Sequence, residues 1–472
     1  MSADRILIVS SHGLGIRDIF LNETLSARLL QRFEIDLMSP FTSIRTDEWG
    51  IRKHYEIGQA SGLGRFFKTL NHRAASTRLR MAFRRFHLET GWESLYEALR
   101  YYSDRPGIGI NYERWARLDR GPLGALLSRA TRLFPIRYPL STEITKANYT
   151  AVVVTHPLDG ECVIAAQIAR RAGVPVICVV VGIDHLFTGG PVMMTPDLLL
   201  VWGAEQAEHW RDHHAVFRPQ LANTRVVQVG GLSHDRMASE TDRGLFADEY
   251  PLIDAEARVV TFAAFTERAY PNQPGTCDAI LQTFSKLGVK GHLVVRVRPG
   301  NDEGIWREYA LSRPDLVTIQ IPRGVFFTKW NTESSINRAT EEHEVKLFGA
   351  TLRRSDVVVT AGFSTVYIDA FAAGTPAIAT AITPDSAASE SLLERTYRLY
   401  KLDVKSIVLV DIATSYEQLM EKVIRVLTSD EQSILNDEVK SVYELVAGSP
   451  DKLAGERAAN AIFSFLNSTD LA

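Results

Sequence analysis

The stretch from Ser355 to Thr383 decides the fold and reads SDVVVTAGFSTVYIDAFAAGTPAIATAIT. Its valine run predicts a short buried strand over Asp356 to Val359, followed by a turn of small residues. The pair Ser364-Thr365 then opens a helix, which Gly374 ends before a further strand begins. The order strand, turn, helix, strand predicts a parallel α/β sheet.

The start of this helix is a candidate anion site. Its first turn leaves backbone N–H groups without intrahelical partners, at the positive end of the helix dipole. With the turn at Gly362 and the hydroxyls of Ser364 and Thr365, these groups converge on a place for a phosphate. Asp369 lies about one turn further on the same face, where its carboxylate can accept hydrogen bonds from a ribose. An ordinary capped helix is the structural alternative.

The stretch resembles the nucleotide-binding segment in the C-terminal domain of GT-B glycosyltransferases, particularly bacterial capsule and surface-polysaccharide transferases and the related CDP-glycerol glycerophosphotransferases. In that group a strand ending in an "aDvvvt" pattern leads to a Ser-Ser or Ser-Thr pair, and an acidic residue follows before Ala, a small residue, Gly and x-Pro. The matching residues are Ser364, Thr365, Asp369, Ala370, Gly374 and Pro376. The chain departs from the pattern because Asp369 stands where Glu is more usual.

The resemblance implies an α/β protein of GT-B fold, with two Rossmann-like domains whose parallel sheets face across a cleft. A length of 472 residues accommodates two domains. We expect an N-terminal acceptor-side domain over residues 1–240, in which the parallel pattern is lost beyond Pro40 and a helical insertion covers about 41–148. Residues 241–472 would form the nucleotide-sugar-binding domain, and its last helix, Lys452 to Phe465, would return towards the first domain.

Composition and charge narrow the classes of partner. The chain is 45% hydrophobic and 23% charged, which is typical of a soluble globular protein. Its net charge of −3 makes no electrostatic case for nucleic acid. Cys162, Cys178 and Cys277 stand singly, which predicts buried, reduced thiols and no zinc site. No apolar run is long enough for a signal peptide or a membrane span, so we expect a cytoplasmic protein with at most peripheral membrane contact.

One segment is locally basic. Residues 65–86 read RFFKTLNHRAASTRLRMAFRRF and contain seven Lys or Arg side chains and no acidic residue. Aromatic and aliphatic residues alternate with the cations, a pattern that suits an anionic membrane surface at the inner face of the cell membrane or a lid over phosphate groups. A solvated helix face is the structural alternative.

The first strand leads into another candidate site. Arg5 to Ser10 reads as a buried strand and is followed by SHGLGIRD, a glycine-rich turn that would let a ligand approach the backbone. Helical spacing follows from Ile19 through Leu30. Asp18 occupies the place of the third glycine of GxGxxG, so dinucleotide binding is not favoured. In GT-B enzymes this loop faces the acceptor, which makes His12 and Asp18 candidates for the general base; a capped turn is the alternative.

Further polar side chains follow the next strands. His156 and Asp159 come after the strand Ala151 to Val154, and Asp184-His185 comes after the one ending near Val181. Because ligands bind at the carboxyl ends of parallel strands, we expect these groups to gather on one rim with His12 and Asp18. An ordinary His has a pKa closer to neutrality than an ordinary Asp, so His156 is the favoured base, although the sequence does not choose among the four catalytic candidates, His156, Asp159, His12 and Asp18.

The second domain offers cations for the donor. The turn Arg296-Val297-Arg298-Pro299-Gly300 resembles the "R-x-H-P" turn of surface-polysaccharide and glycerophosphate transferases, with Arg298 in place of His. Arginine does not release a proton at neutral pH, so it can only neutralise charge. We expect Arg268, Arg296 and Arg298 to contact the donor phosphates. No DxD-like pair or ligand cluster indicates a metal, and no cofactor is implied.

Together these features predict a glycosyltransferase that moves a sugar from a nucleotide-activated donor to a glycan or lipid-linked acceptor in bacterial surface polysaccharide biosynthesis, independently of metal. Three alternatives stay open. They are a CDP-alditol phosphotransferase, a sugar-nucleotide 2-epimerase, and a catalytically silent GT-B subunit that binds a partner. The sequence leaves the sugar, the acceptor and the stereochemistry undetermined.

Overall fold

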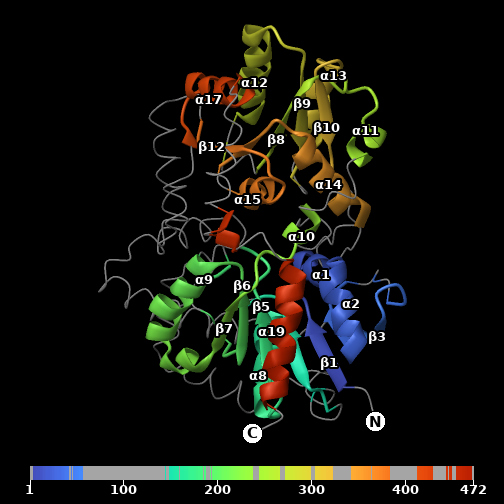
Figure 1. Cartoon of the computed structure of the whole chain (residues 1–472), viewed down its shortest axis with the longest axis vertical. Helices are drawn as coiled ribbons and strands as arrows, with labels where there is room; N and C mark the ends of the chain where they lie inside the picture. Colours follow the sequence, from blue (N-terminus) through green and yellow to red (C-terminus); the bar gives the residue numbers. More distant parts are fainter. Residues whose placement is uncertain are drawn as a thin grey trace, which may run out of the picture.

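The computed structural model describes residues 4–41, 44, 46–56, 144, 148–158, 160–183, 185–187, 192, 194–237, 244–265, 270, 272–298, 303–322, 342–362, 364–382, 412–428, 443–444, 446–448 and 453–469. These residues form two parallel β-sheets with helices interleaved between the strands (Figure 1). The predicted α/β class with two parallel sheets is therefore confirmed.

The first sheet has 7 strands in the order β3-β2-β1-β4-β5-β6-β7. Its strands are β1 (Asp4–Val9), β2 (Phe33–Ser39), β3 (Ile51–Glu56), β4 (Ala151–Val154), β5 (Val176–Val179), β6 (Leu198–Val201) and β7 (Arg225–Gln228). All neighbours are parallel, and Ile6 of β1 is in register with Ile35 of β2 and Ala151 of β4. The chain thus builds outward from β1 in one direction and then returns to its other side with β4.

The second sheet repeats this plan with 6 strands in the order β10-β9-β8-β11-β12-β13. Its strands are β8 (Arg258–Ala263), β9 (Gly291–Arg296), β10 (Val317–Gln320), β11 (Val357–Ala361), β12 (Ala377–Thr380) and β13 (Ile412–Ala413). Val357 of β11 is in register with Val260 of β8, so the strand order reverses between these two.

Helices cover both faces of each sheet. The helices of the first half are α1 (Gly13–Phe20), α2 (Glu23–Arg32), α8 (Gly160–Arg171), α9 (Ala204–His209), the π-helix η1 (Trp210–Ala215), the 3-10 helix η2 (Pro219–Asn223) and α10 (His234–Met237). Those that follow are α11 (Leu245–Glu249), α12 (Gln273–Leu287), α13 (Glu303–Leu311), α14 (Glu342–Arg354), α15 (Thr365–Ala372), α17 (Tyr416–Thr428) and α19 (Ala454–Thr469).

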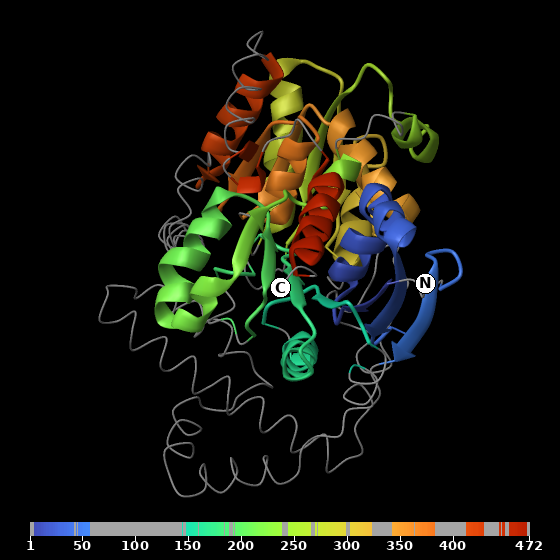
Figure 2. The ribbon, with the colours of Figure 1, turned by 60° about the horizontal axis from the view of Figure 1, so that its bottom comes forward.

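The central strands β1, β4, β5, β6, β8, β9 and β11 are largely apolar because both faces of each sheet are covered there. Ile6 and Ile8 of β1 pack in one cluster with α2 and α19, whereas Leu7 and Val9 pack in another with α8. The C-terminal helix α19 therefore lies against the first sheet, on the face opposite α8 (Figures 1 and 2).

The two halves also share apolar clusters. Tyr367 and Phe371 of α15 pack with Ile183 and Trp202, which follow strands of the first sheet. Leu21 and Met237 of the first half pack with Val345 of α14 in a second shared cluster. Figure 1 shows α15 and the short helix α10 at the level where the two halves meet. Helix α15 is thus an element of both the second sheet and the junction.

Two local predictions are corrected. The single helix from Ile19 through Leu30 is two helices, because Asn22 breaks it: its side chain accepts a hydrogen bond from the Leu25 N–H (2.9 Å) and caps α2. The parallel pattern does not stop at Pro40, since β3 continues the sheet within the expected insertion. The charged sequence IRKHYE disguised this edge strand, whose residues are mostly exposed or half-buried.

Further predictions concern the basic segment, the cysteines and membrane-spanning helices. The basic segment 65–86 lies outside the described residues. The three cysteines are buried and form no disulfide. Within the described part of the chain, no helix combines the length and the apolar character needed to cross a membrane.

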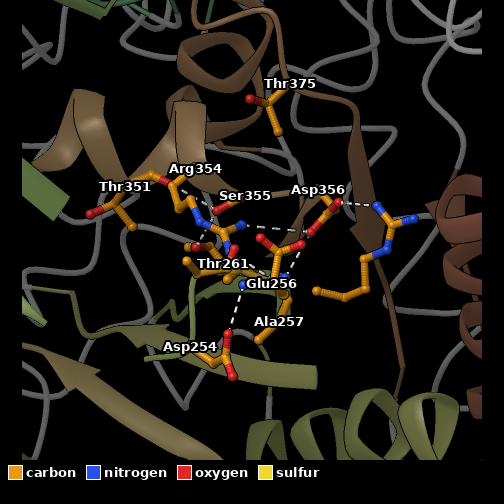
Figure 3. Close-up of polar contacts among 12 residues, drawn as sticks. Asp254, Glu256, Ala257, Thr261, Thr351, Arg354, Ser355, Asp356 and Thr375 are labelled. Atoms are coloured by element: carbon orange, nitrogen blue, oxygen red, sulfur yellow. Dashed lines mark hydrogen bonds and ion pairs between the residues drawn. The ribbon is translucent and has the colours of Figure 1, made fainter. Parts of the chain in front are cut away.

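A polar network fixes β11 against β8 at the amino ends of the two strands (Figure 3). Asp356 accepts hydrogen bonds from the Val259 N–H (2.7 Å) and from Arg258 (2.8 Å). Nearby, the Thr261 and Ser355 hydroxyls bond each other at 2.7 Å. These contacts set the register of the two strands between which the strand order reverses.

We predict that Asp356→Ala lowers the free energy of unfolding by about 1–3 kcal/mol, because two charge-assisted hydrogen bonds are lost and the Val259 N–H is left without its partner. Urea denaturation measures the change. Arg307→Gln is the matched control: it breaks only the exposed i,i+4 pair with Glu303, and its effect should stay within about 0.5 kcal/mol. Equal midpoints for the two variants would contradict the assigned role.

Candidate functional site

Both sheets place their candidate residues where the strand order reverses. In open parallel sheets ligands bind outside the carboxyl ends of the strands at this point. In the second sheet these are the ends of β8 and β11, which lead to Phe265 and Gly362. In the first sheet they are the ends of β1 and β4, which lead to His12 and His156.

The turn after β11 requires glycine. Gly362 has φ of 75°, and its N–H donates to the Thr380 carbonyl at 2.8 Å. The Thr360 hydroxyl donates to the Gly362 carbonyl at 2.6 Å. The Tyr270 ring occupies the space that a Cβ at this position would need. The turn is therefore tightly held by backbone and side-chain contacts, and Tyr270 is part of its wall.

The start of α15 does not have the ordinary cap. Ser364 is the N-cap residue with extended backbone angles (φ −137°, ψ 167°), yet its side chain makes no capping hydrogen bond. Thr365 is exposed. Both hydroxyls therefore lie at the positive end of the helix dipole without serving the helix, an arrangement that suits an anionic ligand.

Arg298 and Arg296 have different surroundings. The Arg298 guanidinium lies 5.2 Å from the centre of the Phe265 ring, and Phe265 packs edge-on to Tyr270 at 5.5 Å. Arg298 is therefore linked by two aromatic rings to the Gly362 turn. Arg296 instead pairs with the buried carboxylate of Glu344 on α14, so its charge is already compensated within the fold. Arg268 lies outside the described residues.

Asp369 is nearly buried at the junction. Its Oδ1 lies 3.3 Å from His234 Nε2, and His234 belongs to α10 of the first half. The other ring nitrogen of His234 lies 3.0 Å from the Tyr443 hydroxyl. Asp369 thus contacts a residue of the other half, and the ribose contact stays a prediction.

Asp18 lies deeper than expected. It is in the second half of α1 rather than at a capped turn, its side chain is fully buried, and Arg17 Nε donates to its Oδ1 at 2.6 Å. Burial raises the pKa of Asp18, and the negative charge of Asp369 adds to this effect, while Arg17 opposes it. A side chain without solvent exposure cannot reach an acceptor directly, so Asp18 is part of the junction rather than of the rim.

Three histidines meet at the rim of the first sheet. The His156 ring stacks on His12 with a 4.8 Å separation of centroids and lies 4.1 Å from His185. Ile183 and Phe187, which flank His185, pack in the cluster that contains α15. The cluster of His12, His156 and His185 therefore lies next to α15. Asp159 and Asp184 lie outside the described residues.

The first loop was expected to be a glycine-rich turn that lets a ligand approach the backbone, and its structure is different. Helix α1 already begins at Gly13, so the loop is largely helical. A Cβ at Gly15 would collide with the hydroxyls of Ser10 and Thr155, which themselves bond at 3.0 Å. Gly15 is thus needed for close packing of α1 on β1 and β4, and not for the approach of a ligand.

The hydrogen bond to His156 decides what its neutral ring can do. The Leu158 N–H donates to His156 Nδ1 at 3.1 Å. A nitrogen that accepts carries no proton, so the neutral ring carries its proton on Nε2. In this state His156 is a hydrogen-bond donor at Nε2, so the expectation that His156 is the general base stays a prediction.

His234 was not among the predicted site residues. It lies in the sequence GGLSHD, residues 230–235, which has the glycines of a turn. Asp235 in this turn accepts from the N–H groups of Ala454 (2.6 Å) and Gly455 (2.8 Å) at the start of α19, which is a structural role. The one available signal was a histidine next to a capping aspartate in a glycine turn. No group of three His, Cys, Asp or Glu side chains in the described ranges has the geometry to hold a metal ion.

The two glycines that flank α15 give a direct test of the turn. We predict that Gly374→Ala costs about 1–2 kcal/mol, since its φ of 75° is unfavourable for a residue with a Cβ and no atom crowds the site. Gly362→Ala shares that strain and must also displace Tyr270, which adds about 1–3 kcal/mol. Urea denaturation of both variants, and of Gly362→Ala combined with Tyr270→Ala, should show the added cost disappear in the double variant. Equal costs for the two glycines would exclude the Tyr270 contact.

No protein-family model matches this chain, and no curated protein matches it significantly. Solved structures do resemble it in fold. The UDP-GlcNAc 2-epimerase from Methanocaldococcus jannaschii superposes with a TM-score of 0.53 at 11% identity, covering 98% of this chain and 99% of that one. The MnaA-UDP co-structure from S. aureus gives 0.53 at 12% identity, with 98% and 97% covered. A glycosyltransferase from Rickettsia africae gives 0.50 at 10% identity over 100% of both chains.

These similarities extend over nearly the whole chain and concern the fold. With both sheets parallel, both reversing their strand order at the centre, and α19 returning to the first half, the chain has the GT-B fold.

Proposed function

We propose that this protein is an enzyme of nucleotide-sugar chemistry, a glycosyltransferase that moves a sugar from a nucleotide-activated donor to a glycan or lipid-linked acceptor. The observation that carries the proposal is the start of α15: a glycine turn at the reversal point of the second sheet, followed by two hydroxyls that do not cap their own helix. Solved structures of this fold include a glycosyltransferase and, separately, the MnaA protein in complex with UDP, which supports the proposal.

On the donor side, the residues present can stabilise a departing nucleotide. The backbone N–H groups at the start of α15, with Ser364 and Thr365, would bind the phosphates. Arg298 would neutralise the charge that grows on the leaving group as the bond to the sugar breaks. Arg268 and Arg296 are proposed for the same task, and Arg296 also pairs with Glu344.

On the acceptor side, the histidine cluster would manage the proton. Direct attack by an acceptor hydroxyl needs one base, and His12 would take that proton while His156 donates a hydrogen bond from Nε2. Asp159 stays a second candidate from the sequence. We further propose action at the cytoplasmic face of a bacterial membrane in surface polysaccharide synthesis, with residues 65–86 as the contact.

A sugar-nucleotide 2-epimerase is the second candidate, because the solved structures of the same fold include an enzyme of that name at comparable similarity. The two are separated by their products. An epimerase converts the sugar-nucleotide without any acceptor, whereas a transferase releases the free nucleotide only when an acceptor is supplied. Stabilisation by CDP-glycerol alone in a thermal-shift panel of UDP-, GDP-, CDP- and CMP-linked compounds would indicate the phosphotransferase. Stabilisation by none of them would indicate a silent subunit.

We predict that Thr365→Glu separates stability from binding. A carboxylate in the first turn of a helix is favourable, so the free energy of unfolding should stay equal or rise by about 0.3–1 kcal/mol. The same charge repels a phosphate, so binding of UDP should weaken by about tenfold or more. Calorimetric titration and urea denaturation measure the two quantities. Gln282→Glu, an equal charge change at an exposed position of α12, is the control, and unchanged UDP affinity in Thr365→Glu would refute the assigned phosphate site.

We predict that His12→Gln and His156→Gln both reduce turnover and leave UDP affinity within about twofold. Loss of a general base costs about 10²–10⁴-fold in rate, so His12→Gln should have the larger effect on kcat. Gln at position 156 can still donate a hydrogen bond, so this variant should retain more activity. The measurement is nucleotide release from the donor that stabilises the protein best. A larger loss for His156→Gln than for His12→Gln would reverse the two roles.

A further inference from the structure

The strongest unassigned feature is the buried chain of contacts Tyr443, His234 and Asp369, which crosses the junction between the two halves. His234 is 2% exposed and Asp369 is 7% exposed. The Trp202 ring meets the His234 ring edge to face, with centroids 4.8 Å apart, and so fixes the plane of the imidazole. His234 thus contacts both Tyr443 and Asp369, which come from separate parts of the chain.

The order of donors along this chain follows from burial. Burial raises the pKa of Tyr443, and the nearby charge of Asp235 adds to it, so its hydroxyl keeps its proton at every working pH. That hydroxyl can donate to His234 Nδ1 at 3.0 Å. The neutral imidazole then carries its proton on Nε2, which lies 3.3 Å from Asp369 Oδ1, although the angle is not that of a hydrogen bond.

Asp369 is left with one oxygen for a ligand. His234 takes Oδ1, while Oδ2 makes no hydrogen bond or ion pair within the described portion of the chain. Arg17 and Asp18 of α1 are close enough to interact electrostatically with Asp369, but they pair with each other. Asp369 lies about one turn beyond the hydroxyls of Ser364 and Thr365, within reach of the sugar ring of a nucleotide whose phosphates occupy the start of α15.

We infer that His234 is a positioning residue: it orients Asp369 across the junction so that Oδ2 accepts a hydrogen bond from a ribose hydroxyl of the donor nucleotide. This inference rests on the proposed function. It makes a residue of the first half responsible for discrimination between ribose and deoxyribose in the second half. Tyr443 completes the arrangement by fixing the tautomer of His234.

The test compares UDP with 2′-deoxy-UDP and 3′-deoxy-UDP by calorimetric titration, with the GDP and CDP sets in parallel. The wild-type protein should prefer at least one ribonucleotide over a deoxy counterpart by about tenfold or more, as expected for a hydrogen bond to a charged group. In His234→Phe, which has no donor, this ratio should fall to within about twofold while affinity for that deoxy compound changes little. His234→Gln keeps an N–H donor and should retain most of the ratio.

Tyr443→Phe gives an independent check, since it removes the partner of His234 Nδ1 without changing Asp369. It should partly reduce the preference for the ribonucleotide over its deoxy counterpart. If His234→Phe does not fold, this variant tests the inference in its place. Equal weakening of both probes in the variants would mean a purely structural role and would overturn the inference. So would a wild-type protein that binds ribo- and deoxyribonucleotides equally; either result leaves the proposed function standing. If the wild-type protein binds none of the nucleotides, the proposed function and this inference both fail.

Discussion

The parallel pairing of β8 with β11 is the constraint on which the position of the Gly362 turn and the start of α15 depends. These strands are neighbours in the sheet but are separated in the chain by β9 and β10, so their connections leave in opposite directions and open a place between them. The pairing of β1 with β4 does the same in the first sheet. Because parallel strands end at one edge, the glycine turn and the histidine cluster are each brought to an edge without any local sequence signal joining them.

Helix α15 serves two purposes that compete for the same eight residues. Its first residues, Ser364 and Thr365, are those proposed to bind a ligand, whereas Tyr367, Phe371 and Asp369 are buried against the first half. Burial of that face stabilises the junction, since apolar area removed from water contributes to stability. A ligand at the start of α15 therefore binds to an element whose other side already fixes the relative position of the two halves.

The arginine and histidine side chains differ in the contacts that they make within the fold. Arg17 and Arg296 are matched with buried carboxylates, Asp18 and Glu344, because an isolated buried charge is costly. Arg298 lies over the Phe265 ring, where β9 ends. Of the histidines, His156 has its tautomer set by a backbone N–H, and His234 contacts a hydroxyl and a carboxylate. Residue type alone does not distinguish these roles.

The sequence by itself determined the parallel α/β class, the strands that carry apolar runs, and the turn and helix start between Gly362 and Thr365. These features follow from local propensity and periodicity, which short segments contain in full. It concealed β3, whose edge position allows a charged sequence, and it placed Asp18 at a rim where the fold buries it. Only the tertiary structure decided that Arg296 is already paired, that His12, His156 and His185 stack, and that His234 contacts Asp369. Such contacts join residues far apart in the chain, and they arise from strand order and helix packing, which no local pattern encodes.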